Sequence, residues 1–211
     1  MLFKTLNVKF KSVFAYEFTK VHGPHGYLSD SFFTDKTIYE KIKSKADDQK
    51  NKRLQHEAYL KHFIEDLNQP LPLWAYVDLL TIADTSFFYS ILEQDVKCNI
   101  SSYFNVPPKI LGKFMHYMTI IRNLCAHGSR LFNRLFDQKP RLNKNERQLL
   151  NTTDEGNLDD AHLYGYILVI RRLLSPEDFN EMKEELISLT KKYPFVHMKY
   201  YGFRDDWKEI L

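Results

Sequence analysis

Apolar residues recur at steps of three and four along residues 107–127, and this periodicity limits the fold of the chain more than any other feature of its sequence. The residues of this stripe are Ile110, Phe114, Met118 (flanked by Tyr117), Ile121, Leu124 and Cys125. Such spacing places side chains on one face of an α-helix, and Pro107 and Pro108 suit the first turn. We therefore expect a long helix that buries one face in a core, with Cys125 as a packing residue and not a nucleophile.

The remainder of the chain indicates further helices. Its 211 residues include 7 glycines and 8 prolines, so little of the chain is rich in turns. No segment alternates apolar and polar residues for long enough to predict a strand. Helical spacing is found over residues 2–20, 35–67, 73–80, 84–96, 161–174 and 175–192. The sequence therefore predicts an all-α helical bundle, organised as a single domain over residues 1–211.

Two local signals refine this prediction. The stretch KADDQKNKR, in the middle of the pattern over residues 35–67, is so polar that it indicates either a solvated helix face or a surface break. Ser175, Pro176 and Asp178 match the start of a helix, with Ser175 as N-cap in a capping-box arrangement. Residues 137–160 are polar and resemble a series of turns.

Positive charge is concentrated in one segment. The net charge of the chain is +3, which by itself is too small to identify a nucleic-acid partner. Residues 122–147 alone contain seven basic and two acidic residues, a net charge of +5. The basic excess therefore lies within and directly after the last turns of the helix expected over residues 107–127.

Cysteine usage and hydropathy predict a cytoplasmic protein. Cys98 and Cys125 have no partner at a CxxC spacing, which is typical of a reducing compartment. No apolar run approaches the roughly 20 residues that a membrane span requires. The first twenty residues are interrupted by lysines and show no hydrophobic region or cleavage site of a signal peptide.

The sequence predicts no metal and no other cofactor. Four histidines lack a cysteine or carboxylate partner at the spacing of metal ligands; they are His22, His25, His56 and His62. The stretch HEAYLKH lacks the H-E-x-x-H spacing of a metalloprotease helix, and no glycine-rich phosphate loop is present. Trp74 and Tyr76 have ring faces on which nucleobases stack, but aromatic residues on an amphipathic helix are more often core residues.

Three polar residues stand out at the end of the helix expected over residues 107–127. Asn123 and His127 are four residues apart and share one face, whereas Arg122 lies about 140° around the helix from His127. An imidazole transfers protons near neutral pH, and a guanidinium stabilises charge on phosphorus. The residue types alone nevertheless favour a structural explanation, in which the histidine caps helix carbonyls and the arginine pairs with an acid.

Gly128 decides how the following arginines are presented. A helix that continued through this glycine would extend the line of Asn123 and His127 to Arg130 and Arg134, at i+7 and i+11. Glycine also ends or loosens helices, because it adopts backbone conformations that other residues avoid. Both outcomes agree with the sequence.

The motif residues resemble a known family. RNLCAH fits the R-x-x-x-x-H signature of HEPN domains, and IIRNLCAHGSRLFNR (120–134) resembles the hallmark of the Abi-like abortive-infection family, the AbiD/AbiF group. Residues 70–92 and 8–28 resemble other segments of that family, so that the resemblance covers about residues 5–136. It implies a HEPN-like helical bundle whose motif helix covers about residues 107–134.

The resemblance also implies a function, because many HEPN proteins are ribonucleases that act as dimers. It implies a phage-defence toxin that cleaves RNA by attack of the 2′-hydroxyl, without a metal, as a homodimer. Arg122 would stabilise the phosphate, His127 would act as acid or base, and Asn123 would orient one of them. The residues implied to bind RNA are Arg130, Asn133, Arg134, Lys139 and Arg141. RNA is then the substrate, and the resemblance to members proposed to be held inactive by a small RNA implies a regulatory RNA as a further partner.

The sequence departs from the family pattern in two places. Family members usually carry a further N-terminal region, so the resemblance implies a shortened version. They often have a second histidine after the motif histidine, where this chain has Gly128. An alternative hypothesis is therefore a catalytically silent module that binds RNA or a protein.

Overall fold

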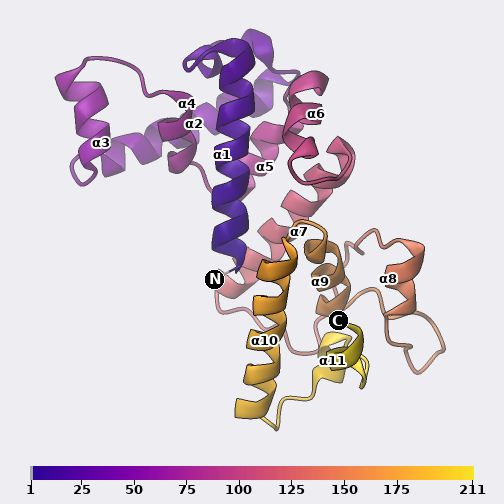
Figure 1. The fold of residues 1–211 in the computed structure, drawn as a ribbon. Coiled ribbons are helices and arrows are strands. Elements are labelled where there is room, and N and C mark those ends of the chain that lie inside the picture. Colours follow the sequence, from indigo (N-terminus) through magenta and orange to yellow (C-terminus); the bar gives the residue numbers. More distant parts are fainter. Residues whose placement is uncertain (1) are drawn as a thin grey trace. The chain divides into compact units, whose positions relative to one another are not determined.

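The computed structural model describes residues 2–211, with side chains from residue 5 onward, and the regular secondary structure of the described chain is helical. Two isolated bridges, Phe33–Leu92 and Thr152–Leu158, are the whole of its β-structure. The prediction of an all-α protein is confirmed. The helices are α1 (Leu2–His22), α2 (Lys36–Arg53), α3 (Ala58–Lys61), α4 (Leu73–Tyr76), α5 (Ile82–Ser90), α6 (Gln94–Ser102), α7 (Pro108–Ala126), α8 (Lys144–Gln148), α9 (Leu163–Arg171), α10 (Pro176–Lys192) and α11 (Trp207–Ile210) (Figure 1).

The described residues fall into two compact units, which we call unit 1 (residues 3–119) and unit 2 (residues 120–211). The boundary lies inside α7, so that this helix contributes its first turns to unit 1 and its last turns to unit 2. The single domain expected over residues 1–211 stays a prediction. No helix of the described residues is both long enough and apolar enough to cross a membrane.

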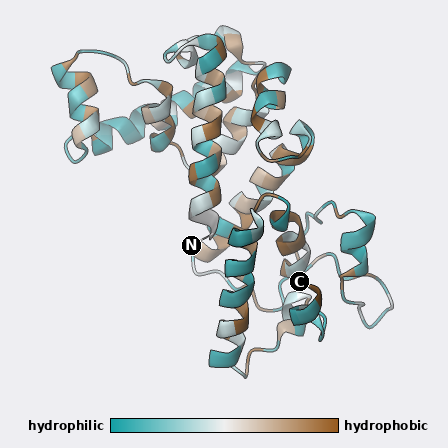
Figure 2. Cartoon of the chain, in the orientation of Figure 1, coloured by the Kyte–Doolittle hydropathy of each residue, from teal (hydrophilic) through white to brown (hydrophobic). Residues whose placement is uncertain are grey.

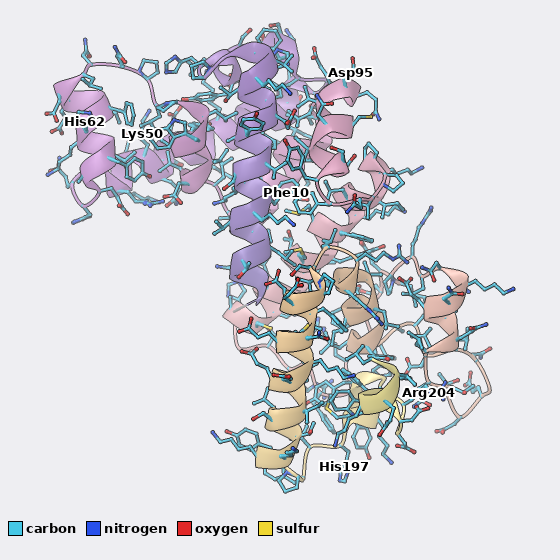
Figure 3. The ribbon with its side chains drawn as sticks, viewed as in Figure 1. Phe10, Lys50, His62, Asp95, His197 and Arg204 are labelled. Carbon is cyan, nitrogen blue, oxygen red and sulfur yellow. The ribbon has the colours of Figure 1, made fainter. Side chains whose placement is uncertain are left out.

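Unit 1 is organised around aromatic rings on α1. Phe10, Phe14 and Phe18 follow one another at steps of four and are at most 1% exposed (Phe10 is labelled in Figure 3). The ring of Phe10 lies 5.6 Å from that of Tyr89, and the ring of Phe14 lies 5.4 Å from that of Phe88. Because aromatic side chains bury large apolar areas, these contacts between α1 and α5 form the centre of the unit 1 core.

Two helical patterns of unit 1 are shorter than the sequence predicts. The polar stretch KADDQKNKR lies inside α2, which is largely hydrophilic in Figure 2. It is therefore a solvated helix face, and the helix ends only at Arg53. The helix expected over residues 84–96 is wrong, because α5 ends at Ser90 and α6 begins at Gln94. The Ile91 carbonyl between them accepts hydrogen bonds from the backbone N–H and the hydroxyl of Thr34.

Unit 2 packs its helices around α9. Every residue from Tyr164 to Ile170 is buried, so α9 is enclosed on all sides. The ring of Tyr164 lies 4.4 Å from that of Phe203, and burial raises the pKa of Tyr164 to about 12. The core cluster consists of Leu150, Tyr164, Ile167, Leu168, Phe179, Phe203, Trp207 and Leu211.

Capping residues set the starts of two helices of unit 2. Ser175 accepts a hydrogen bond from the backbone N–H of Asp178, as its predicted role as N-cap of α10 requires. Within the stretch expected to form turns, Asn143 and Glu146 make a capping box that starts α8. Glu146 also pairs with Arg172 at the end of α9, which ties α8 to the core helix.

A buried carboxylate in unit 1 makes the stability of the protein depend on pH. Asp84 accepts hydrogen bonds from Lys45 and from Thr81, its partner in the capping box of α5. Burial acts to raise the pKa of Asp84, but these hydrogen bonds outweigh it and lower the pKa below its usual value. The pair therefore stabilises the fold at a pH above the ordinary aspartate value of about 4, and this contribution is lost as the pH falls through the lower, folded-state value.

We expect Asp84→Asn to reduce the free energy of unfolding at pH 7 by about 1–3 kcal/mol, because Lys45 loses its charged partner. The difference between the variant and the unmodified chain should shrink as the pH falls below 4 in urea-unfolding experiments. Asp48→Asn is the control, since Asp48 is exposed on α2. A difference that stays constant down to pH 2 would contradict the role assigned to the Asp84 carboxylate.

Candidate functional site

Helix α7 ends in a hydrogen-bonded glycine cap. Gly128 has a φ of +60°, its N–H donates to the Cys125 carbonyl (3.2 Å), and the N–H of Ser129 donates to the Leu124 carbonyl (2.9 Å). These two bonds and the left-handed glycine are those of a Schellman motif. The motif helix therefore stops at Ala126. Its expected extension to residue 134, with Arg130 and Arg134 in line with His127, is wrong.

The three motif residues lie in the last turn of α7 and at its cap. Arg122 and His127 are exposed and Asn123 is partly exposed. The backbone N–H of His127 donates to the Asn123 carbonyl at 3.0 Å, so the two side chains leave the same face of the helix. Within the described chain, none of the three side chains makes a hydrogen bond or ion pair with another residue.

Because these side chains have no partners among the described residues, the sequence-based explanations that His127 caps helix carbonyls and that Arg122 pairs with an acid are excluded. The His127 imidazole donates to none of the helix carbonyls, and no carboxylate pairs with Arg122 among the described residues. Cys125 is exposed, so its expected packing role is wrong. The buried stripe of α7 ends at Ile121, which is 3% exposed, and Leu124 is only partly buried.

The chain after the cap is fixed to the rest of unit 2 by its backbone. The N–H of Asn133 donates to the Tyr200 carbonyl (3.0 Å), and the N–H of Phe136 donates to the Ala161 carbonyl (2.8 Å). Asn133 has a φ of +47°, a conformation that asparagine tolerates better than most residues. Residues 129–136 are therefore a held loop and not a continuation of α7.

The five residues expected to bind RNA fall into two groups. Arg130, Asn133 and Arg141 expose their side chains to solvent. Arg134 is half-buried, with its guanidinium 5.9 Å from the centre of the Phe136 ring. Lys139 forms an ion pair with Asp160 at 2.7 Å. The structure thus leaves Arg130 and Arg141 as exposed cations, whereas Arg134 and Lys139 have intramolecular partners.

An aromatic cluster beside this loop was missed by the sequence analysis. Phe132 is 46% exposed, and its ring lies 4.9 Å from that of Tyr200 and 6.1 Å from that of Tyr201. The ammonium of Lys199 lies 5.2 Å from the centre of the Tyr200 ring, and the ring of His197, which is labelled in Figure 3, lies 6.4 Å from that of Tyr200. The alternation of aromatic and basic residues in HMKYY is the sequence signal that could have indicated this surface.

Metal ligands are not gathered at this site. The part of the chain that the structure describes contains no group of three or more His, Cys, Asp or Glu side chains that could hold a metal ion. The functional groups that the site offers are therefore the imidazole of His127, the amides of Asn123 and Asn133, several guanidinium groups and the rings of Phe132 and Tyr200. These groups transfer protons, bind phosphate and stack on bases.

Comparison with known proteins gives one finding. The family model described as Abi-like protein matches residues 2–133, which is more than half of the chain. The chain belongs to the Abi-like protein family. The Abi-like match includes the motif residues and the cap at Gly128 and ends at Asn133, so that α8 to α11 lie outside it. No curated protein and no solved structure matches the sequence significantly.

Substitution of glycine by alanine should have opposite effects at the cap of α7 and inside the helix. Gly128→Ala should lower the free energy of unfolding by about 1–2 kcal/mol, because a left-handed alanine is strained. No atom lies within 4 Å of the added Cβ, so the effect would come from the backbone alone. Gly112→Ala should be neutral or stabilising by up to about 1 kcal/mol, since its Cβ would meet the Tyr89 ring at an ordinary 3.6 Å.

Urea unfolding of the two variants measures both effects. Gly128→Asn serves as a further control, because asparagine adopts the left-handed conformation more readily than alanine and should cost less. Equal stability of Gly128→Ala and the unmodified chain would contradict the cap.

Proposed function

We propose that this Abi-like chain is an endoribonuclease that cleaves RNA without a metal and acts in phage defence. The observation that carries the proposal is the solvent exposure of Arg122, Asn123 and His127 without any intramolecular partner in the described chain. Folding gives these side chains no role, yet together they supply the groups that phosphodiester cleavage uses. Membership of the Abi-like family supports the role in defence, and RNA is found in the cytoplasm, where the protein would act.

The reaction follows from the chemistry of RNA. The neutral His127 imidazole removes the proton from a 2′-hydroxyl, and the 2′-oxygen attacks the adjacent phosphorus. A bond from phosphorus to the 2′-oxygen forms and the bond to the 5′-oxygen breaks, which leaves a 2′,3′-cyclic phosphate and a 5′-hydroxyl. Arg122 stabilises the negative charge on the pentacoordinate phosphorus, and Asn123 would orient one of the two side chains, Arg122 or His127, once RNA is bound.

A homodimer accounts for the second proton transfer. The leaving 5′-oxygen needs a proton, and one imidazole in one chain is already acting as the base. A second copy would bring a second His127, protonated, to the opposite side of the same phosphate. The position of Arg122, about 140° around α7 from His127, also fits a site in which groups from two helices converge.

The RNA would extend from the motif over the loop that follows it. Arg130 and Arg141 are exposed cations that would contact phosphates, and Phe132 and Tyr200 present rings on which bases stack. The Asn133 amide is exposed and would form hydrogen bonds with the RNA. Arg134 and Lys139 have intramolecular partners, so they would add to the positive electrostatic potential around the RNA more than they would contact it directly. A small RNA that competes for this surface, or a protein antitoxin that covers it, would hold the enzyme inactive.

A second candidate function is a silent module that binds RNA or a protein without cleaving it. One observation favours it: no described side chain hydrogen bonds to the His127 imidazole, whereas catalytic histidines are usually oriented by a third group. The two functions differ in one measurement, the appearance of a 2′,3′-cyclic phosphate.

We expect Arg122→Ala and His127→Ala each to reduce the rate of RNA cleavage by about 10²–10⁴-fold, because each removes a group that acts in the transition state. Both residues are exposed, so the free energy of unfolding should change by less than about 0.5 kcal/mol. The control is His116→Ala, which removes another exposed histidine from α7 and should leave cleavage unchanged.

The assay uses a labelled single-stranded RNA and the same strand with 2′-deoxy sugars, with and without EDTA. The proposal requires a cyclic phosphate product from the RNA, no cleavage of the deoxy strand and no effect of the chelator. Full activity of the His127→Ala variant would contradict the catalytic assignment. Binding without product under all conditions would establish the silent module.

A further inference from the structure

Unit 1 contains a groove between α1 and the segment formed by α4 and the 3₁₀ turn Val77–Leu79. Its volume is about 670 Å³, and residues from Val8 to Lys20 line it at steps of three and four along α1. Trp74 and Asp78 line the opposite side. α1 and α4 lie side by side in Figure 1. The motif residues of α7 are not part of it.

The structure separates two aromatic residues that the sequence analysis grouped together. Tyr76 is 5% exposed and packs on the Tyr27 ring at 4.2 Å, so it is a core residue as expected. Trp74 is 60% exposed, although the expectation was that it too would be buried. The preceding residue, Leu73, is fully buried, and its N–H donates to the Pro24 carbonyl. Burial of Leu73 and Tyr76 therefore turns Trp74 outward.

Two exposed rings therefore line the same groove. Trp74 is held edge-on against Phe63, at 5.7 Å and 71°, which leaves ring area open to solvent. Tyr16 on α1 is 59% exposed and lines the groove as well. Exposed aromatic rings are the platforms on which unpaired nucleobases stack.

The charges along the groove favour an anion. Glu17 is the one acidic residue of α1, and it is buried and accepts a hydrogen bond from Tyr103. The Asp78 carboxylate is bound by Arg53 at 3.1 Å and by the hydroxyl of Tyr59.

The two lysines that line the groove differ in whether their ammonium groups are free to bind a ligand. Lys11 is partly buried and donates to the Leu80 carbonyl, while Lys20 is exposed. A ligand in the groove would therefore meet a cation at Lys20, whereas the Asp78 carboxylate is already bound by Arg53, which also pairs with Glu57.

We propose that this groove binds single-stranded RNA, with bases stacked on Trp74 and Tyr16 and a phosphate bound by Lys20. The strand must be unpaired, because bases inside a duplex offer no free face to a ring. The choice of RNA over DNA rests on the proposed function. The binding of an unpaired strand rests on the groove itself.

The chain contains a natural probe of this site. It has two tryptophans, and Trp207 is 3% exposed in the unit 2 core, so added ligands reach Trp74 alone. We expect oligouridylate RNA of about 12 nucleotides, within the range that single-strand sites cover, to quench the fluorescence of Trp74. The protein is the full chain with His127→Ala, so that cleavage does not consume the RNA.

Variants measured by anisotropy of labelled RNA locate the contact. Trp74→Ala and Tyr16→Ala should each weaken binding about tenfold or more. Trp74→Phe should keep most of the affinity and lose the fluorescence change. Lys20→Gln should weaken binding and lower the slope of log affinity against log salt by about one. Phe87→Ala is the matched control, because Phe87 is 52% exposed on α5 and does not line the groove.

The outcomes of these experiments test RNA binding by the groove independently of the proposed ribonuclease activity. RNA binding that is insensitive to Trp74→Ala and Tyr16→Ala overturns the groove as an RNA site, even if the unmodified chain cleaves RNA. Binding that depends on Trp74 supports the groove, even if no cleavage occurs. Absence of binding to any single strand overturns it and leaves a protein partner as the occupant. Equal binding of oligouridylate and oligothymidylate supports the groove and shows that it does not read the 2′-hydroxyl.

Discussion

Burial of one face of α7 determines where every candidate catalytic group lies. Phe114, Met118 and Ile121 are at most 3% exposed, and they hold this face inward. Because successive residues of a helix are about 100° apart, fixing the apolar face also fixes the direction of each polar residue on the same helix. Arg122 and His127 then leave the helix toward solvent. Their exposure follows from hydrophobic packing and not from any contact of their own.

The glycine cap sets the second constraint on the site. Gly128 ends α7 one residue after the motif histidine, and the two bonds of the cap turn the chain away from the helix axis. His127 thus directly follows Ala126, the last residue of α7, with its imidazole at the free end of the helix instead of inside a continuous polar stripe. A further turn of helix would have placed Arg130 on the same face, three residues after His127.

Local signals predicted the parts of the fold that depend on neighbouring residues. The helix predicted over residues 107–127 and the N-cap at Ser175 depend on residues within one or two turns, and both were confirmed, with α7 covering Pro108–Ala126. The break at Ile91 could not be predicted, because it is stabilised by hydrogen bonds from Thr34, which lies far away in the sequence. For the same reason the sequence did not place Phe132 beside Tyr200, which is positioned by the bond between Asn133 and the Tyr200 carbonyl.

Exposure was the least predictable property of the site. Cys125 has the period of the apolar stripe, but it lies in the last turn of α7 and is exposed. Trp74 is as apolar as its neighbours, yet burial of Leu73 and Tyr76 leaves it outside the core. In both cases the pattern predicts the face of a helix correctly or nearly so. Which residues of that face are covered by other parts of the chain, and which remain exposed, depends on the tertiary structure.

If the groove of unit 1 binds RNA and the motif residues of unit 2 cleave it, substitutions in the two places should change different kinetic constants of the proposed enzyme. Stacking on Trp74 and Tyr16 would be equally strong in the bound substrate and in the transition state, because these rings would touch bases and not the reacting phosphate. Such uniform binding lowers KM and leaves kcat unchanged. Arg122 would interact most strongly with the charge that develops on phosphorus, so its loss lowers kcat. A chain in which groove variants changed kcat as strongly as motif variants would have to couple the groove to the chemical step, for instance by positioning the scissile phosphate.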